Sequence, residues 1–137
     1  MNNSLAPIVL FCYKRLKHTK ETVESLQHNY LSNKSIIYIY SDGYKSENDK
    51  DEVEEVRNYL KTIIGFKEIH IIEQKENKGL ANSIIDGVTS IINKYEKIIV
   101  IEDDIVTSRF FLKFMNSALD YYENTDKIWH INRCNYP

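Results

Sequence analysis

Short apolar runs alternate with longer amphipathic stretches along the chain, and this alternation restricts the fold more than any other feature. The runs are rich in Ile, Val, Phe and Tyr, and each is bounded by polar or turn-forming residues. Continuous apolar runs of this length are typical of strands that are buried on both faces of a parallel sheet. The predicted strands are residues 8–13, 36–40, 69–72, 98–101 and 128–131.

The stretches between these runs carry apolar residues three and four positions apart, which is the spacing of one helix face. These faces predict helices within residues 19–30, 53–63, 80–95 and 110–122. Gly65 is placed to end the second of these helices, because glycine commonly follows the last helical residue. Strands that alternate with helices predict an α/β fold: three layers, with a mostly parallel sheet and helices on both faces.

Composition narrows the class of protein. The 137 residues are 42% apolar and 28% charged, which fits one globular domain over residues 1–137. A formal net charge of -2 does not suit a general nucleic-acid binder. Cys12 lies inside an apolar run and Cys134 lies near the end, so no disulfide framework is expected. With no apolar segment long enough to span a bilayer, we expect a cytoplasmic protein, and peripheral membrane contact is compatible with the sequence.

Polar residues follow the predicted strands directly. The carboxyl ends of parallel strands share one edge of a sheet, and ligands bind in the crevice outside that edge. We therefore expect these side chains to converge on one site. They are Lys14, Arg15, Asp42, Asn77, Lys78, Glu102, Asp103 and Asp104.

The triplet Glu102-Asp103-Asp104 is the most informative of these groups. Three adjacent carboxylates repel one another, so a buried strand that delivers them to one point predicts a bound cation. Mg²⁺ and Mn²⁺ prefer oxygen ligands and often combine one or two carboxylates with substrate phosphates. The alternative is a solvated turn in which Asp104 or Thr107 caps the next helix.

The remaining candidates are individually weak. Asp42 could bind a base or a ribose, or it could be an ordinary Asp-Gly turn residue. Lys14 and Arg15 could contact phosphate or base, or they could be solvated surface cations. Asn77 and Lys78 precede a helix N-terminus, which could help to bind an anion. The four histidines lack metal-ligand spacing, and the sequence contains no P-loop, no G-x-G-x-x-G and no G-x-S-x-G motif.

Together these motifs resemble the nucleotide-sugar domain of GT-A glycosyltransferases. Cys12-Tyr13-Lys14-Arg15 closes the first strand, Ser41-Asp42-Gly43 closes the second, Asn77-Lys78-Gly79 opens a helix, and Glu102-Asp103-Asp104 precedes Phe110-Phe111. The chain is most similar to the N-acetylglucosaminyltransferase I type, whose metal motif is also Glu-Asp-Asp, and to bacterial family-2-like sugar transferases. The resemblance extends over about residues 7–137.

The resemblance implies a role for each residue. Asp42 corresponds to the acid that contacts the uracil or base edge of a UDP-sugar donor, and Lys14 or Arg15 to a basic residue that also serves the nucleotide. Asp104 corresponds to the direct ligand of Mn²⁺ or Mg²⁺, and Glu102 and Asp103 to positions that face the ribose and sugar. The metal would stabilise the leaving nucleoside diphosphate.

The resemblance also implies that this chain corresponds to an amino-terminal half. Members of the family continue beyond the fifth strand with the wall that binds a saccharide or glycoconjugate acceptor, and inverting members supply a general base there. No base is identified among these residues, and surface polysaccharide synthesis is implied by the resemblance alone. Two alternatives stay open: a non-catalytic nucleotide-binding or interaction domain, and a nucleotidyltransferase or phosphohydrolase that uses the acid triplet as a metal site.

Overall fold

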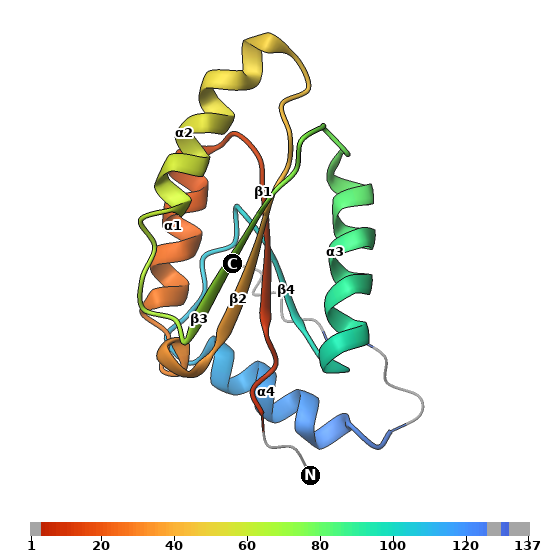
Figure 1. Cartoon of the computed structure of the whole chain (residues 1–137). Coiled ribbons are helices and arrows are strands. Elements are labelled where there is room, and N and C mark those ends of the chain that lie inside the picture. Colours follow the sequence, from red (N-terminus) through yellow and green to blue (C-terminus); the bar gives the residue numbers. More distant parts are fainter. Residues whose placement is uncertain (1–3, 126–129, 132–137) are drawn as a thin grey trace, which may run out of the picture.

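The computed structural model describes residues 4–125 and 130–131. Four parallel strands form one sheet in the order β3-β2-β1-β4, with helices on both faces, so the predicted α/β fold is confirmed (Figure 1). The strands are β1 (Ile8–Cys12), β2 (Ile36–Ser41), β3 (Glu68–Glu73) and β4 (Ile99–Glu102). The α-helices are α1 (Leu16–Gln27), α2 (Lys50–Leu60), α3 (Leu80–Tyr95) and α4 (Phe111–Tyr122).

The predicted elements agree with the structure in type and order. Each of the four strands begins and ends within one residue of its predicted position. Of the fifth predicted strand, 128–131, residues 128 and 129 lie outside the described residues, and residues 130 and 131 are not in a strand. No helix in the described part of the chain is both long and apolar enough to cross a bilayer.

Two helices lie three residues earlier than predicted: α1 begins at Leu16 and not at residue 19, and α2 begins at Lys50 and not at residue 53. The first helix, α1, ends at Gln27, so Tyr30 lies beyond it. The second, α2, ends at Leu60, and the chain then tightens into a turn, because the Ile63 amide donates to the Leu60 carbonyl at 3.2 Å. Ile63 is nevertheless buried. The apolar spacing therefore continued past the helical backbone, and Gly65, with φ of +93°, lies in the loop that leads to β3 instead of ending the helix.

One face of the sheet is aliphatic and is covered by α1, α2 and α4. Its core contains Ile8 and Leu10 of β1, with Val23 from α1, Val56 from α2 and Leu112 from α4. Cys12 is buried in the same cluster, and burial raises the pKa of its thiol to about 12. Cys12 is therefore a core residue, as its position in an apolar run predicts.

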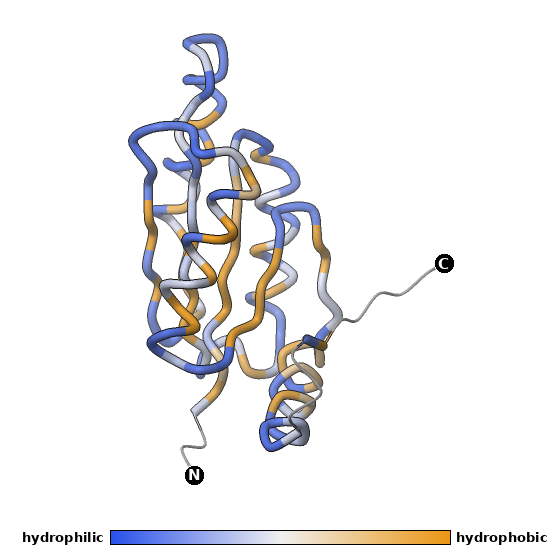
Figure 2. The backbone as a smooth tube through the Cα atoms, turned by 90° about the vertical axis from the view of Figure 1, so that its right-hand side faces the viewer, coloured by the Kyte–Doolittle hydropathy of each residue, from blue (hydrophilic) through white to orange (hydrophobic). Residues whose placement is uncertain are grey.

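The other face is aromatic and is covered by α3. Phe11 of β1 stacks on Tyr40 of β2 with ring centroids 5.4 Å apart. Gly87 lets α3 approach this layer, since a Cβ at that position would lie 2.8 Å from the Phe11 ring. Figure 2 shows hydrophobic strands inside the molecule and hydrophilic loops at its upper end, where the carboxyl ends of the strands lie.

Candidate functional site

The strand order reverses between β1 and β4. From β1 the chain moves outward to β2 and β3, and then returns to the other side of β1 to form β4. Ligands of open α/β sheets bind at the carboxyl ends of the strands where the order reverses in this way. Arg15 follows β1 and Asp103 and Asp104 follow β4, so these three residues flank that point.

Arg15, after β1, binds both aspartates that follow β4. Its Nη2 atom donates a hydrogen bond to Asp103 Oδ1 and another, of 3.3 Å, to Asp104 Oδ2. The Asp103 side chain is 7% exposed, whereas those of Arg15 and Asp104 are about half exposed, at 47% and 43%. The hydrogen bond to Asp103 is the largest cause that raises the pKa of Arg15 above its usual value. A buried carboxylate thus depends on a cation that water can reach.

Glu102 does not join this pair. It is the last residue of β4, is exposed, and lies beside Phe11 in the register of the sheet. Among residues 4–125 and 130–131, no three His, Cys, Asp or Glu side chains are grouped so that they could hold a metal ion. The expectation that three acids converge on one ion is therefore wrong for Glu102, because successive side chains of a strand point to opposite faces and Asp103 lies in the turn that follows Glu102.

The capping alternative is also wrong. Helix α4 begins at Phe111, and its N-cap, Phe110, makes no side-chain capping bond. Thr107 instead shares a hydrogen bond with Ser25 at 3.0 Å and accepts one from Asn29 at 3.0 Å. Asp103 and Asp104 are therefore not explained as helix caps.

Lys14 points to a different partner from Arg15. Its Nζ lies 2.6 Å from Asp49 Oδ1 and 3.6 Å from Glu52, at the start of α2. The Tyr13 hydroxyl donates to the other Asp49 oxygen at 3.0 Å. The hydrogen bond from Lys14, followed by that from Tyr13, holds the pKa of Asp49 below its usual value. In this structure Arg15, and not Lys14, is the cation that faces the acids after β4.

Asp42 accepts four hydrogen bonds and is buried. Its Oδ1 accepts from the backbone amides of Gly43 and Lys78, each at 2.9 Å. Its Oδ2 accepts from the Gly79 amide at 3.0 Å and from Asn77 Nδ2 at 3.2 Å. A carboxylate has about four acceptor sites, so these contacts use its whole capacity. The structure thus brings Asp42 together with Asn77 and Lys78. The Asp42 carboxylate holds the loop that contains Asn77 and Lys78.

Two further contacts shape this loop. The backbone of Glu76 passes so close to Gly43 that a side chain does not fit there, because a Cβ at Gly43 would lie 2.5 Å from the Glu76 carbonyl carbon. The Lys78 side chain turns along α3, where its Nζ donates to Asp86 at 2.8 Å, and this bond raises the pKa of Lys78. The Lys78 cation is therefore directed at a surface acid.

Arg57 is a buried residue that sequence reasoning missed. It donates to the Gln74 carbonyl at 2.7 Å, to the Asp42 carbonyl at 3.3 Å and to Ser41 Oγ at 3.3 Å. These bonds tie the end of β2 to the end of β3 beneath the Asp42 loop. The signal was present, because Arg57 lies four residues after Val53 and three before Leu60, on the apolar face of α2.

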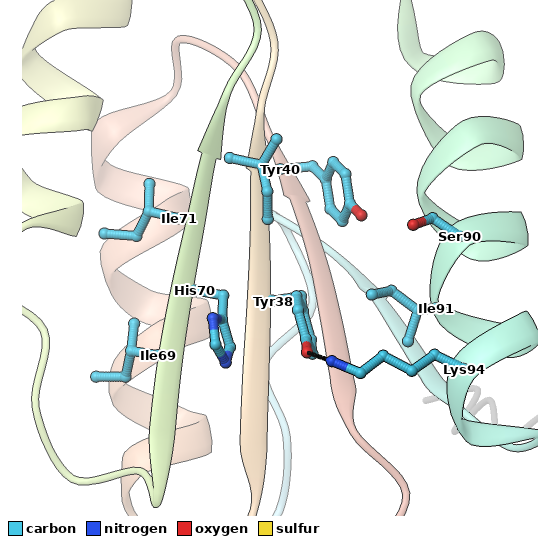
Figure 3. Close-up of a pocket in the computed structure, with 9 residues that line it drawn as sticks. Tyr38, Tyr40, Ile69, His70, Ile71, Ser90, Ile91 and Lys94 are labelled. Atoms are coloured by element: carbon cyan, nitrogen blue, oxygen red, sulfur yellow. Dashed lines mark hydrogen bonds between the residues drawn. The ribbon is translucent and has the colours of Figure 1, made fainter.

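A separate groove of about 550 Å³ lies on the aromatic face, between β3 and α3 (Figure 3). The Tyr38 hydroxyl is 2.8 Å from that of Tyr95, and Lys94 Nζ donates to it at 3.4 Å. His70 stacks on Tyr38 at 4.5 Å between centroids. The Tyr38, Lys94 and His70 side chains are thus engaged with one another along the middle of the strands, and none of the predicted site residues lies there.

Comparisons with known proteins support the fold. No model of a known family matches the chain, and no curated protein matches it. Among solved structures, the chain is similar to S. aureus TarS, a glycosyltransferase, with a TM-score of 0.57 and 14% identity. The match covers 85% of this chain but only 20% of the TarS chain. The likeness shows that the arrangement of strands and helices is shared with part of a glycosyltransferase.

The chemistry of the Asp103–Asp104 pair fits a hard cation. One oxygen of each carboxylate lies within hydrogen-bonding reach of the same Arg15 nitrogen, so a single positive centre already sits between them. Mg²⁺ is commonly held by one or two carboxylates, with water and substrate phosphates completing its shell. Two carboxylates are therefore sufficient for an ion that a diphosphate also binds.

Proposed function

We propose that this chain is the nucleotide-sugar-binding part of a GT-A glycosyltransferase, which transfers a sugar from a UDP-sugar to an acceptor hydroxyl. The observation that carries the proposal is the contact of Arg15 with the Asp103–Asp104 pair where β1 and β4 end. The fold shared with part of TarS supports the same assignment.

In this proposal Asp104, which is more exposed, is the direct ligand of Mn²⁺ or Mg²⁺, and Asp103 lies beside it facing the donor. The bound ion would act as a Lewis acid that stabilises the leaving diphosphate. Arg15 would contribute a second positive charge to the same phosphates, with a planar guanidinium that suits phosphate oxygens. Glu102 would face the ribose or sugar from the end of β4.

Asp42 and its loop would form the base side of the site. A contact between Asp42 and the edge of uracil requires the carboxylate to give up one of its four present hydrogen bonds. The bond to Asn77 is the longest of the four, at 3.2 Å, and Asn77 also donates to the Gly43 carbonyl at 2.8 Å. Release of the Asn77 bond is therefore the least costly way to free an acceptor for the base.

The second candidate is a nucleotide-binding domain without turnover. It rests on the same contacts, because Arg15 and the Asp103–Asp104 pair could hold a metal-bound nucleotide whether or not an acceptor is deprotonated nearby. Both candidates predict donor binding, and they differ in whether sugar is transferred once an acceptor-binding region is supplied.

Calorimetric titration with UDP tests the proposal. We expect UDP to bind in the presence of Mn²⁺ and to bind much more weakly without it. Asp104→Ala should remove the effect of Mn²⁺ on UDP binding. Asp120→Ala is the control, because it removes an exposed acid of α4 that is paired with Lys97, and it should leave that effect unchanged. Equal UDP affinity with and without Mn²⁺, or in the Asp104 variant, would overturn the metal assignment.

A further inference from the structure

Asp103 depends on a partner that is free to move. The hydrogen bond that Asp103 makes in the described part of the chain comes from Arg15. A buried carboxylate is costly without a compensating charge, so Asp103 depends on this ion pair. The Arg15 side chain is about half exposed, at 47%, and carries its charge at the end of a long flexible stem.

The same guanidinium nitrogen occupies the position between the two carboxylates. It contacts both Asp103 and Asp104, and the proposed function assigns Asp104 as the ligand of a divalent ion, with Asp103 beside it. An arginine and a metal ion cannot both take this position, because two positive centres within about 4 Å repel by several kcal/mol near a protein surface. Metal binding therefore requires Arg15 to leave.

We propose that Arg15 is a built-in counter-cation, which holds the Asp103–Asp104 pair in the free protein and moves to the diphosphate when metal and nucleotide bind. This inference rests on the proposed function and deepens it. Its consequence is a thermodynamic coupling: the metal alone must displace Arg15 without compensation, whereas with a nucleoside diphosphate present the displaced guanidinium gains phosphate oxygens. Metal and nucleotide then strengthen each other's binding through one side chain.

Titration of Mn²⁺, followed by the electron paramagnetic resonance signal of the free ion, tests this coupling without any measurement of activity. In the absence of nucleotide we expect Arg15→Met to bind Mn²⁺ about tenfold more tightly than the unmodified chain, within the range of ordinary coupled sites. With saturating UDP, Arg15→Met should bind Mn²⁺ no more tightly than the unmodified chain. Lys17→Met is the matched control, because it removes one exposed positive charge from the first turn of α1, which begins directly after Arg15, and should leave both affinities unchanged.

The expected sign separates this role from a merely structural one. If Arg15 only stabilised the local structure around the two aspartates, its removal would weaken Mn²⁺ binding. An unchanged or weaker Mn²⁺ affinity in folded Arg15→Met, together with Mn²⁺ binding by the unmodified chain in the presence of UDP, would overturn this inference and leave the proposed function standing. Absence of Mn²⁺ binding by the unmodified chain even with UDP would overturn both.

A second variant covers the case in which Arg15→Met does not fold, as judged by circular dichroism. Arg15→Lys keeps the charge but replaces the planar fork with a single ammonium group, which bridges two carboxylates less well. We expect Arg15→Lys to bind Mn²⁺ about threefold more tightly than the unmodified chain without nucleotide, a smaller coupling of the same kind. An affinity equal to that of the unmodified chain would overturn the inference.

Discussion

Two aspartates at the carboxyl edge of the sheet are almost equally buried but are satisfied in different ways. Asp42, 7% exposed, accepts three of its four hydrogen bonds from backbone amides. Asp103, which is 5% exposed as a whole residue, is paired with the half-exposed side chain of Arg15. Backbone donors cannot leave without unfolding the loop, whereas a side chain can. The mobility of the partners, and not the burial of the acid, therefore decides how readily a carboxylate can turn to a ligand: Asp42 can release the bond from the Asn77 side chain alone, whereas the partner of Asp103 can leave altogether.

The largest effect is expected on the Asp42 side. Asp42→Ala leaves the amides of Lys78 and Gly79 without their acceptor, and should lower the free energy of unfolding by about 3 kcal/mol. Urea denaturation measures this loss. Asp42→Asn, which keeps one acceptor oxygen, should lose less. A loss below about 1 kcal/mol for Asp42→Ala would show that the loop does not depend on this carboxylate.

The loop against Asp42 also depends on a close backbone approach. Gly43→Ala places a Cβ 2.5 Å from the Glu76 carbonyl carbon, and overpacking of this kind should cost about 2 kcal/mol. Gly79→Ala tests the other kind of cost, because its Cβ would meet no atom within 4 Å and the loss, about 1–3 kcal/mol, comes from φ of +75° and ψ of 157° alone. Urea denaturation of both variants measures the two costs. A loss below about 0.5 kcal/mol for Gly43→Ala would show that contact with Glu76 does not constrain Gly43.

On the Asp103 side we expect little change in stability and a large change in binding. Asp103→Asn removes the buried charge and leaves Arg15, which is exposed enough for water to solvate it. The free energy of unfolding should therefore change by less than about 1 kcal/mol. Calorimetry should show that the Mn²⁺-dependent part of UDP binding is lost. A destabilisation as large as that of Asp42→Ala would show that both carboxylates are structural.

The smallest effect concerns Asp49, an acid at the same edge held by Lys14. Its pKa is lower in the folded protein than its usual value, so its ion pair stabilises the fold above about pH 4 and is lost as the pH falls through the lowered pKa. The difference in melting temperature between the unmodified chain and Asp49→Asn should be present at pH 6 and should disappear in stronger acid. Asp51→Asn controls for the loss of an exposed charge from the start of α2. A difference that does not shrink as the solution is made more acidic would contradict the assigned pair.

The sequence was a good guide to the elements because their signals are local. The apolar runs at Ile8 and Ile36 predicted strands within a residue of their ends, since a buried parallel strand needs a continuous apolar run. The end of α2 was misplaced because Ile63 continues the apolar spacing after the helical hydrogen bonds have stopped at Leu60. Burial and helical backbone coincide over most of a helix, but they separate at its end.

By itself the sequence determined the α/β alternation and which polar side chains follow each strand, because both are properties of consecutive residues. Only the tertiary structure decided how those side chains pair. It directed Lys14 to Asp49 and Arg15 to Asp103, although the two cations are adjacent in the chain. It also separated Glu102 from the two aspartates that follow it. Such pairings depend on the directions of side chains from distant segments that meet at one edge of the sheet, and sequence spacing does not record those directions.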